Sequence, residues 1–249
     1  MKKITALFAN PGLFLVFCFV LFLNGSCKYS GAEVIRGDGN LVTKSFEADY
    51  FHSIELKGAF NVTLGEGERA HVTLETDSNL HELIEIYVEQ NILYVSGYGE
   101  QALKPTKMDV SIVYPDLHRV NVSGACKITS PGKVVTDELV FDLSGASDIE
   151  LELTVNKLTT RVAGAANIHL MGNAQNHSID LAGASNLKAE KLITESTSIN
   201  LSGAGSATVY ASSILNASMS GFGRIHYHGN PTETNINKSG FGTIRSAGK

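Results

Sequence analysis

The sequence predicts an all-β protein, a parallel β-helix (β-solenoid) with coils of about 19 residues. A Ser/Ala-Gly-Ala motif recurs through its second half, with steps of 21, 19, 19, 20, 18 and 19 residues between successive central glycines. Apolar and polar residues alternate around each glycine, which is the period of strands and not of helices. Leucine-rich repeats have a similar length but lack this pattern. The central glycines are Gly124, Gly145, Gly164, Gly183, Gly203, Gly221 and Gly240.

Two apolar columns flank the glycines and predict the core. Two positions before the glycine stand Val122, Leu143, Val162, Leu181, Leu201, Met219 and Lys238. Four positions after it stand Ile128, Ile149, Ile168, Leu187, Ala207, Ile225 and Ile244. Alternation places the column three positions before the glycine on the outside. That column contains Asn121, Asp142, Arg161, Asp180, Asn200, Ser218 and Asn237.

Each coil is expected to pair its strands with the next coil about 4.8 Å away. The glycine is expected to supply unusual backbone dihedral angles at a narrow corner. Stacked coils expose unpaired strands at their ends, so the ends need caps. Lys238 interrupts an apolar column, and Phe222 and Phe241 replace alanine at the corner, which predicts that the last two coils form the C-terminal cap.

The N-terminus resembles a bacterial lipoprotein signal. Residues 1–26 begin with a short basic region and contain an apolar run, 13–23, that is too short to span a bilayer. Cys27 follows Gly25 and Ser26, which predicts lipid attachment at Cys27. Plain cleavage and a retained anchor are the alternatives. Acyl chains on Cys27 would hold the protein to a membrane.

The chain after the signal is expected to form a tether and one domain. Residues 27–40 are polar and rich in glycine, which predicts a lipid tether without a folded element. Residues 41–249 are interpreted as a single β-solenoid domain, less regular over 41–115 and regular over 116–249. Gly58 is interpreted as the centre of a degenerate first repeat. A helical turn is expected over 77–83, and a loop over 97–106.

Three groups of residues are candidate sites of chemistry. Asp142 and Asp180 share a column, as the carboxylates of a glycan-cleaving enzyme would, but Arg161 separates them and favours a solvated polar ladder. His226 and His228 alternate along a strand and could begin a zinc site, although no third ligand is evident. Cys126 is expected to fill a buried position and not to act as a nucleophile.

The residues of the first half carry a resemblance. The segments concerned are Phe51 to Ile54, Gly58 to Val62, Leu74 to Leu80 and Tyr114 to Leu117, which lead into the first Ser-Gly-Ala motif. They resemble the head GIN domain family of auto-transporter adhesins, exported proteins common in Bacteroidetes. The resemblance covers roughly residues 41–247. It implies a right-handed parallel β-helix-like fold and brings no set of functional residues.

These observations predict a non-enzymatic protein of the cell envelope. A net charge of −5 lacks the basic footprint that nucleic-acid binding needs. We expect an adhesin that recognises a surface polysaccharide or protein through the solenoid face, with no cofactor and with membrane contact through the lipid anchor only. The expected location is the outer membrane. The alternative is a structural or assembly protein of the periplasm or outer membrane, and the third hypothesis is a glycan-cleaving β-helix enzyme.

Overall fold

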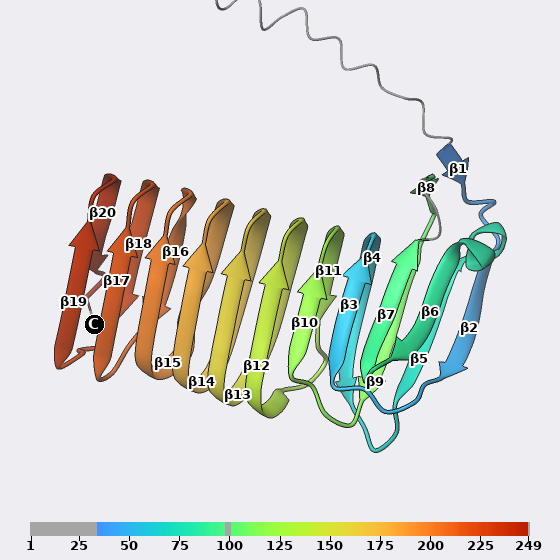
Figure 1. Cartoon of the computed structure of the whole chain (residues 1–249), viewed down its shortest axis with the longest axis horizontal. Helices are drawn as coiled ribbons and strands as arrows, with labels where there is room; N and C mark the ends of the chain where they lie inside the picture. The colour runs from blue at the N-terminus through green and yellow to red at the C-terminus, as the bar shows by residue number, and fades with distance from the viewer. Residues whose placement is uncertain (1–33, 98–100, 249) are drawn as a thin grey trace, which may run out of the picture. The chain divides into compact units, whose positions relative to one another are not determined.

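The computed structural model describes residues 34–97 and 101–248 (Figure 1). Val34–Lys249 forms one compact unit. The signal segment 1–26, Cys27 and the tether as far as residue 33 lie outside the described residues. Strands dominate the described residues, and the helical structure among them is the short 3-10 helix η2 (Ser78–Leu83).

Most of the strands belong to one continuous sheet of 18 strands, which winds through the successive coils, and the other two form a small separate pair. The strands before the regular repeats are β1 (Val34–Arg36), β2 (Leu41–Glu47), β3 (Ser53–Lys57), β4 (Ala59–Glu66), β5 (His71–Asp77), β6 (Ile84–Glu89), β7 (Ile92–Gly97), β8 (Ala102–Lys104) and β9 (Met108–Tyr114). The strands of the regular repeats are β10 (Arg119–Val122), β11 (Ala125–Thr129), β12 (Val134–Leu143), β13 (Ala146–Val162), β14 (Ala165–Leu181), β15 (Ala184–Leu201), β16 (Ala204–Tyr210), β17 (Ile214–Met219), β18 (Phe222–His228), β19 (Glu233–Lys238) and β20 (Phe241–Ser246).

The coils stack with equivalent residues side by side, as a β-solenoid requires (Figure 1). Strands that precede the repeat glycines form the pre-glycine ladder, which runs through β3, β10, the ends of β12 to β15, β17 and β19. Strands that follow the glycines form the post-glycine ladder, through β4, β11, the beginnings of β13 to β15, β16, β18 and β20. Neighbouring strands in both ladders are parallel, which confirms the predicted fold class.

The two predicted core columns are buried in the regular coils. Val122, Leu143 and Leu201 are at most 2% exposed before the glycine, and Ile128 and Ile149 are at most 1% exposed after it. Lys238 at the last coil is exposed, and Ile244 is only partly buried. Apolar side chains from both ladders therefore fill the interior, and their burial is the main favourable contribution to stability.

The repeat glycines are required by close packing and not by their dihedral angles. A Cβ atom on Gly145 would lie 1.8 Å from the carbonyl oxygen of Gly124, and one on Gly183 would lie 1.7 Å from that of Gly164. Among the repeat glycines only Gly58 has a positive φ, of 145°. The expectation that the corner needs unusual dihedral angles is therefore wrong for the regular coils, because each corner instead approaches the previous one too closely for a side chain.

Gly58 belongs to the first coil, as predicted. Strand β3 pairs with β10, and β4 pairs with β11, so this coil stacks directly on the coil of Gly124 although 66 residues separate the two glycines. The amide of Ala125 donates to the carbonyl oxygen of Gly58 at 2.8 Å. The chain between these coils folds to the other side of the first coil, where β7 pairs with β3 and β9 pairs with β4.

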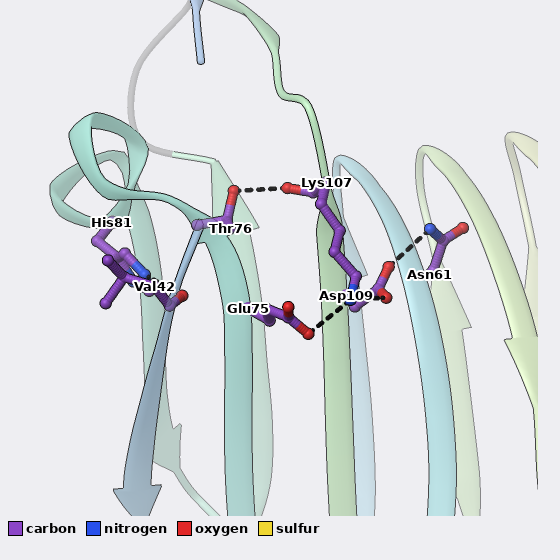
Figure 2. A network of polar contacts seen from close by, with 7 residues as sticks. All are labelled: Val42, Asn61, Glu75, Thr76, His81, Lys107 and Asp109. Atoms are coloured by element: carbon purple, nitrogen blue, oxygen red, sulfur yellow. Dashed lines mark hydrogen bonds and ion pairs between the residues drawn. The ribbon is translucent and has the colours of Figure 1, made fainter. Parts of the chain in front are cut away.

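Antiparallel strands close this N-terminal end of the stack. Strand β6 pairs with β7, β5 pairs with β9, and β2 pairs with β5, all antiparallel. A polar network ties β5, β9 and β4 together (Figure 2). Lys107 Nζ donates to Glu75 Oε2 at 2.6 Å and lies 3.3 Å from Asp109 Oδ2, while Asn61 Nδ2 donates to Asp109 Oδ1 at 2.8 Å. Figure 2 also shows the Thr76 hydroxyl, which donates to the Lys107 carbonyl oxygen at 2.8 Å.

Two expectations for the N-terminal half need correction. Residues 34–40 were expected to lack folded structure, but β1 pairs with β8, which itself lies inside the expected loop 97–106. The buried side chain of Asp77 explains the order of this segment, because its carboxylate accepts hydrogen bonds from the amides of Gly39 at 2.8 Å and Thr106 at 2.7 Å. The expected helical turn is present as η2, and Asp77 precedes it without capping it through its side chain.

Candidate binding groove

A groove of about 680 Å³ runs across successive coils on the post-glycine ladder. It lies over the three positions that follow the glycine, of which the first is exposed, the middle one is buried or half-buried, and the third is exposed or half-exposed. We call it the corner groove. One side presents the alanines Ala125, Ala146, Ala165, Ala184 and Ala204. The other side presents Asp148, Asn167, Asn186, Ser206 and Arg224.

The small residues of the repeat create this groove. Alanine after the glycine leaves only a methyl group on the outer surface, while the amide and hydroxyl groups two positions further on extend from the strand. The strand register aligns the alanines with one another and the polar side chains with one another, since Ala146 pairs with Ala165 and Asn167 pairs with Asn186. The result is an apolar track beside a polar track, and Ser206 Oγ donates to Asn186 Oδ1 at 2.8 Å along the polar one.

The groove ends at an aromatic and cationic cluster. Phe222 and Phe241 are 66% and 77% exposed, and their rings stack with centroids 5.4 Å apart at 13°. Arg224 lines the groove, and Arg245 Nε donates to His226 Nε2 at 3.1 Å on the same outer surface. We call Phe222, Phe241, Arg224, Arg245 and His226 the tail patch.

The aspartates considered for catalysis do not converge. The guanidinium groups of Arg119 and Arg161 both pair with the Asp142 carboxylate, the latter at 3.1 Å. Asp180 pairs in register with Arg161, so the strand of Arg161 separates it from Asp142 by about 10 Å across two strand spacings. The column is the solvated polar ladder that the sequence favours.

The remaining candidates lie where the alternation predicts. Cys126 is 3% exposed, its Sγ lies 3.8 Å from the Gly58 carbonyl oxygen, and burial raises the pKa of its thiol, all of which suit a space-filling residue. His226 and His228 both lie on β18 and are partly exposed. In residues 34–97 and 101–248 no three His, Cys, Asp or Glu side chains gather closely enough to hold a metal ion.

Three buried polar residues, His177, Thr194 and Thr197, were missed by the sequence reasoning. His177 and Thr160 meet in the interior, and the Thr194 and Thr197 hydroxyls lie 2.7 Å apart there. The Thr197 hydroxyl donates to the carbonyl oxygen of Tyr210 at 2.7 Å. His177 and Thr197 stand at positions that the alternation places inside, so their position in the alternation was the available signal. Thr194 does not, because the alternation shifts along β15 on either side of it.

Together, the stacked parallel coils and the lengthwise groove define a β-solenoid with a groove along one outer ladder. A family model matches residues 50–231 and is described as "Putative auto-transporter adhesin, head GIN domain". The chain belongs to this family. The assignment supports an adhesin-like protein of the cell envelope, exported or at the cell surface.

Solved structures share the fold. One described as a putative adhesin from Bacteroides fragilis is 23% identical, with a TM-score of 0.81 over 85% of this chain and 99% of that one. A putative adhesin from Parabacteroides merdae is 24% identical, with a TM-score of 0.67 over 87% and 100%. A structure described as a putative lipid binding protein from Parabacteroides distasonis is 19% identical, with a TM-score of 0.70 over 86% and 100%.

No curated protein matches the chain. Within the described residues no helix is long and apolar enough to cross a membrane.

Proposed function

We propose that this protein is a non-enzymatic adhesin that binds a surface polysaccharide or protein along the corner groove. The observation that carries the proposal is the continuity of the groove, which extends from the coil of Ala125 to the coil of Arg224. Parallel strands repeat about every 4.8 Å, so an extended partner would meet the same pair of tracks at each step. Concave surfaces with a few aligned polar groups are the usual form of binding sites.

The proposal includes attachment of the protein to the outer membrane through a lipid on Cys27. The lipoprotein-like residues around Cys27 support this part. Protease treatment of intact cells tests the exposure of the solenoid, and a Cys27→Ser variant tests whether membrane retention depends on the lipid. Digestion on intact cells supports adhesion, whereas protection until the outer membrane is opened contradicts it.

Substitutions that fill the groove test the binding surface. Ala165→Arg and Ala184→Arg each place a long side chain on the exposed alanine track, and Asn200→Arg places the same side chain on the exposed surface of the pre-glycine ladder. Binding of the full-length protein to arrays of glycans and matrix proteins is measured for all three. Loss of binding in the first two and retention in Asn200→Arg is expected. Equal effects at all three positions would reject the corner groove as the site.

The open C-terminal end supports a second function, assembly with other envelope proteins. Strands β19 and β20 have a partner on one side only within the described residues, so their outer backbone groups are free to pair with another chain. Copurification of envelope proteins that depends on β19 and survives Ala184→Arg would favour this function over adhesion through the groove.

A further inference from the structure

The C-terminal part of the chain has the opposite charge to the whole. From Ala211 to Lys249 the sequence contains one acidic side chain, that of Glu233, whereas the net charge of the chain is −5. The cations of the same segment are Arg224, Lys238, Arg245 and Lys249. An acidic protein with a local basic region attracts anionic partners to that region.

The tail patch gathers two of these cations beside two aromatic rings. Strands β18 and β20 are paired so that Phe222 lies beside Phe241 and His226 lies beside Arg245. Arg224 follows Phe222 by two residues, so alternation places it on the same outer surface. The patch therefore lies on the outer surface of the sheet, across its last two strands on this ladder.

Within the described part of the chain no carboxylate pairs with the two guanidinium groups. Among the ion pairs of residues 34–97 and 101–248, none includes Arg224 or Arg245, whereas Arg119 and Arg161 both pair with Asp142. The local burial of His226 together with the charges of Arg245 and Arg224 lowers the pKa of the His226 imidazole. The patch thus presents positive charge that an external anion can pair with.

The patch is continuous with the corner groove. Gly223 and Arg224 form the last part of the groove lining, and Phe222 continues the alanine track in register with Ala204. A membrane would contact the protruding rings but would not enter a groove that leads away from them. A peptide strand cannot add to the groove by main-chain pairing, because the strands beneath it already pair on both sides.

We propose that the corner groove and tail patch together bind an acidic polysaccharide, with a sugar carboxylate held by Arg224 and Arg245 and a sugar ring against Phe222 and Phe241. This inference rests on the proposed function and names its class of ligand. The amides of Asn167 and Asn186 and the hydroxyl of Ser206 provide hydrogen bonds for sugar hydroxyl groups further along the groove.

Polygalacturonate and its fully methyl-esterified form provide the test, because they differ in charge and share a backbone. Binding of each to the full-length protein is measured by calorimetry at low and moderate salt. Polygalacturonate is expected to bind at least tenfold more tightly, with affinity that falls as salt rises. Arg224→Gln and Arg245→Gln are each expected to lower the affinity for polygalacturonate about tenfold. Phe241→Ser is expected to lower the affinity for both polymers, because both contain the same sugar ring.

Arg161→Gln is the matched control, because it removes one positive charge from the pre-glycine ladder and leaves the patch intact. A loss of affinity in this variant equal to that of Arg224→Gln overturns the proposal. If the two polymers bind equally well, the ligand does not need carboxylate groups and the proposal is wrong. If polyglutamate competes as well as polygalacturonate does, the ligand is an acidic protein and not an acidic polysaccharide. If neither polymer binds but the array finds a ligand that Ala184→Arg abolishes, this inference fails alone. If the array finds none, the proposed function fails with it.

Discussion

The Nε2 atom of His177 lies 3.1 Å from the Oγ1 atom of Thr160 inside the solenoid. The His177 side chain is 2% exposed and that of Thr160 is fully buried. Burial lowers the pKa of the His177 imidazole to about 3. The ring is therefore neutral in the folded protein at neutral pH, and the pair forms a hydrogen bond between neutral groups.

Acid is expected to destabilise the protein through His177. In the unfolded chain the imidazole takes up a proton near pH 6.5, whereas in the folded chain it does so only near pH 3. Stability from this group is thus complete above pH 6.5 and is lost as pH falls from 6.5 towards 3. Between pH 7.5 and pH 4.5 the free energy of unfolding is expected to fall by about 3 kcal/mol from His177.

Urea unfolding of the full-length protein at pH 7.5 and pH 4.5 checks this expectation. His177→Gln keeps a polar side chain that does not titrate, so it is expected to reduce the difference between the two pH values. His228→Gln removes a partly exposed imidazole and serves as the control. An unchanged pH dependence in His177→Gln would show that other groups control acid unfolding.

Gly145→Ala is expected to destabilise the stack. The new Cβ would lie 1.8 Å from the carbonyl oxygen of Gly124, so the two corners must move apart and weaken the hydrogen bonds beside them. We expect a loss of about 3 kcal/mol in the free energy of unfolding. Gly132→Ala is the control, because a Cβ there meets no atom within 4 Å, and it is expected to change stability by less than about 0.5 kcal/mol. Similar losses in the two variants would contradict the close-packing explanation.

Asp77→Ala is expected to release the N-terminal segment 34–40. The variant loses the acceptor for the amides of Gly39 and Thr106, which hold this segment against η2 and the chain that leads into β9. Hydrogen exchange measured by mass spectrometry should become faster in peptides that contain Gly39 or Thr106. Asp148→Ala, on the exposed polar track, is the control. Unchanged exchange at Gly39 in Asp77→Ala would mean that the pairing of β1 with β8 is sufficient to hold the segment.

The regular coils could be predicted because their information is local. The glycine period and the alternation of residues such as Val122 and Ile128 determine which side chains are buried. The N-terminal end could not be predicted in the same way, because β5 and β2 pair antiparallel through contacts that the repeat does not encode. The order of residues 34–40 depends on long-range polar contacts with Asp77 and Asn79, which follow no sequence pattern.

The candidate site was only partly predictable for a related reason. The sequence singled out Phe222 and Phe241 as unusual corner residues and assigned them to a C-terminal cap. That prediction is wrong, because β19 and β20 continue the parallel stack to Ser246 and leave its end open within the described residues. The structure adds that their rings stack on an exposed surface and that Arg245 and His226 share it. Alternation gives the side of the sheet for each residue, but it does not give the exposed fraction of a ring or the partner of a guanidinium group.

Lys238→Ile is expected to promote association through the open C-terminal end. Lys238 occupies a position that is apolar in the inner coils, and its Nζ donates to the Gly242 carbonyl oxygen at 3.1 Å across the end of the last coil. A charged residue that points inward on an edge strand opposes pairing with another chain, because pairing would bury the charge. Ile236 on the same strand is 48% exposed, so isoleucine at 238 would extend an apolar edge.

Light scattering after size-exclusion chromatography is expected to show a larger rise of mass with concentration for Lys238→Ile than for the unmodified protein. Lys188→Ile, on the exposed outer surface, adds the same side chain away from the edge and is the control. If both variants associate equally, added hydrophobicity and not the inward charge at the edge governs association.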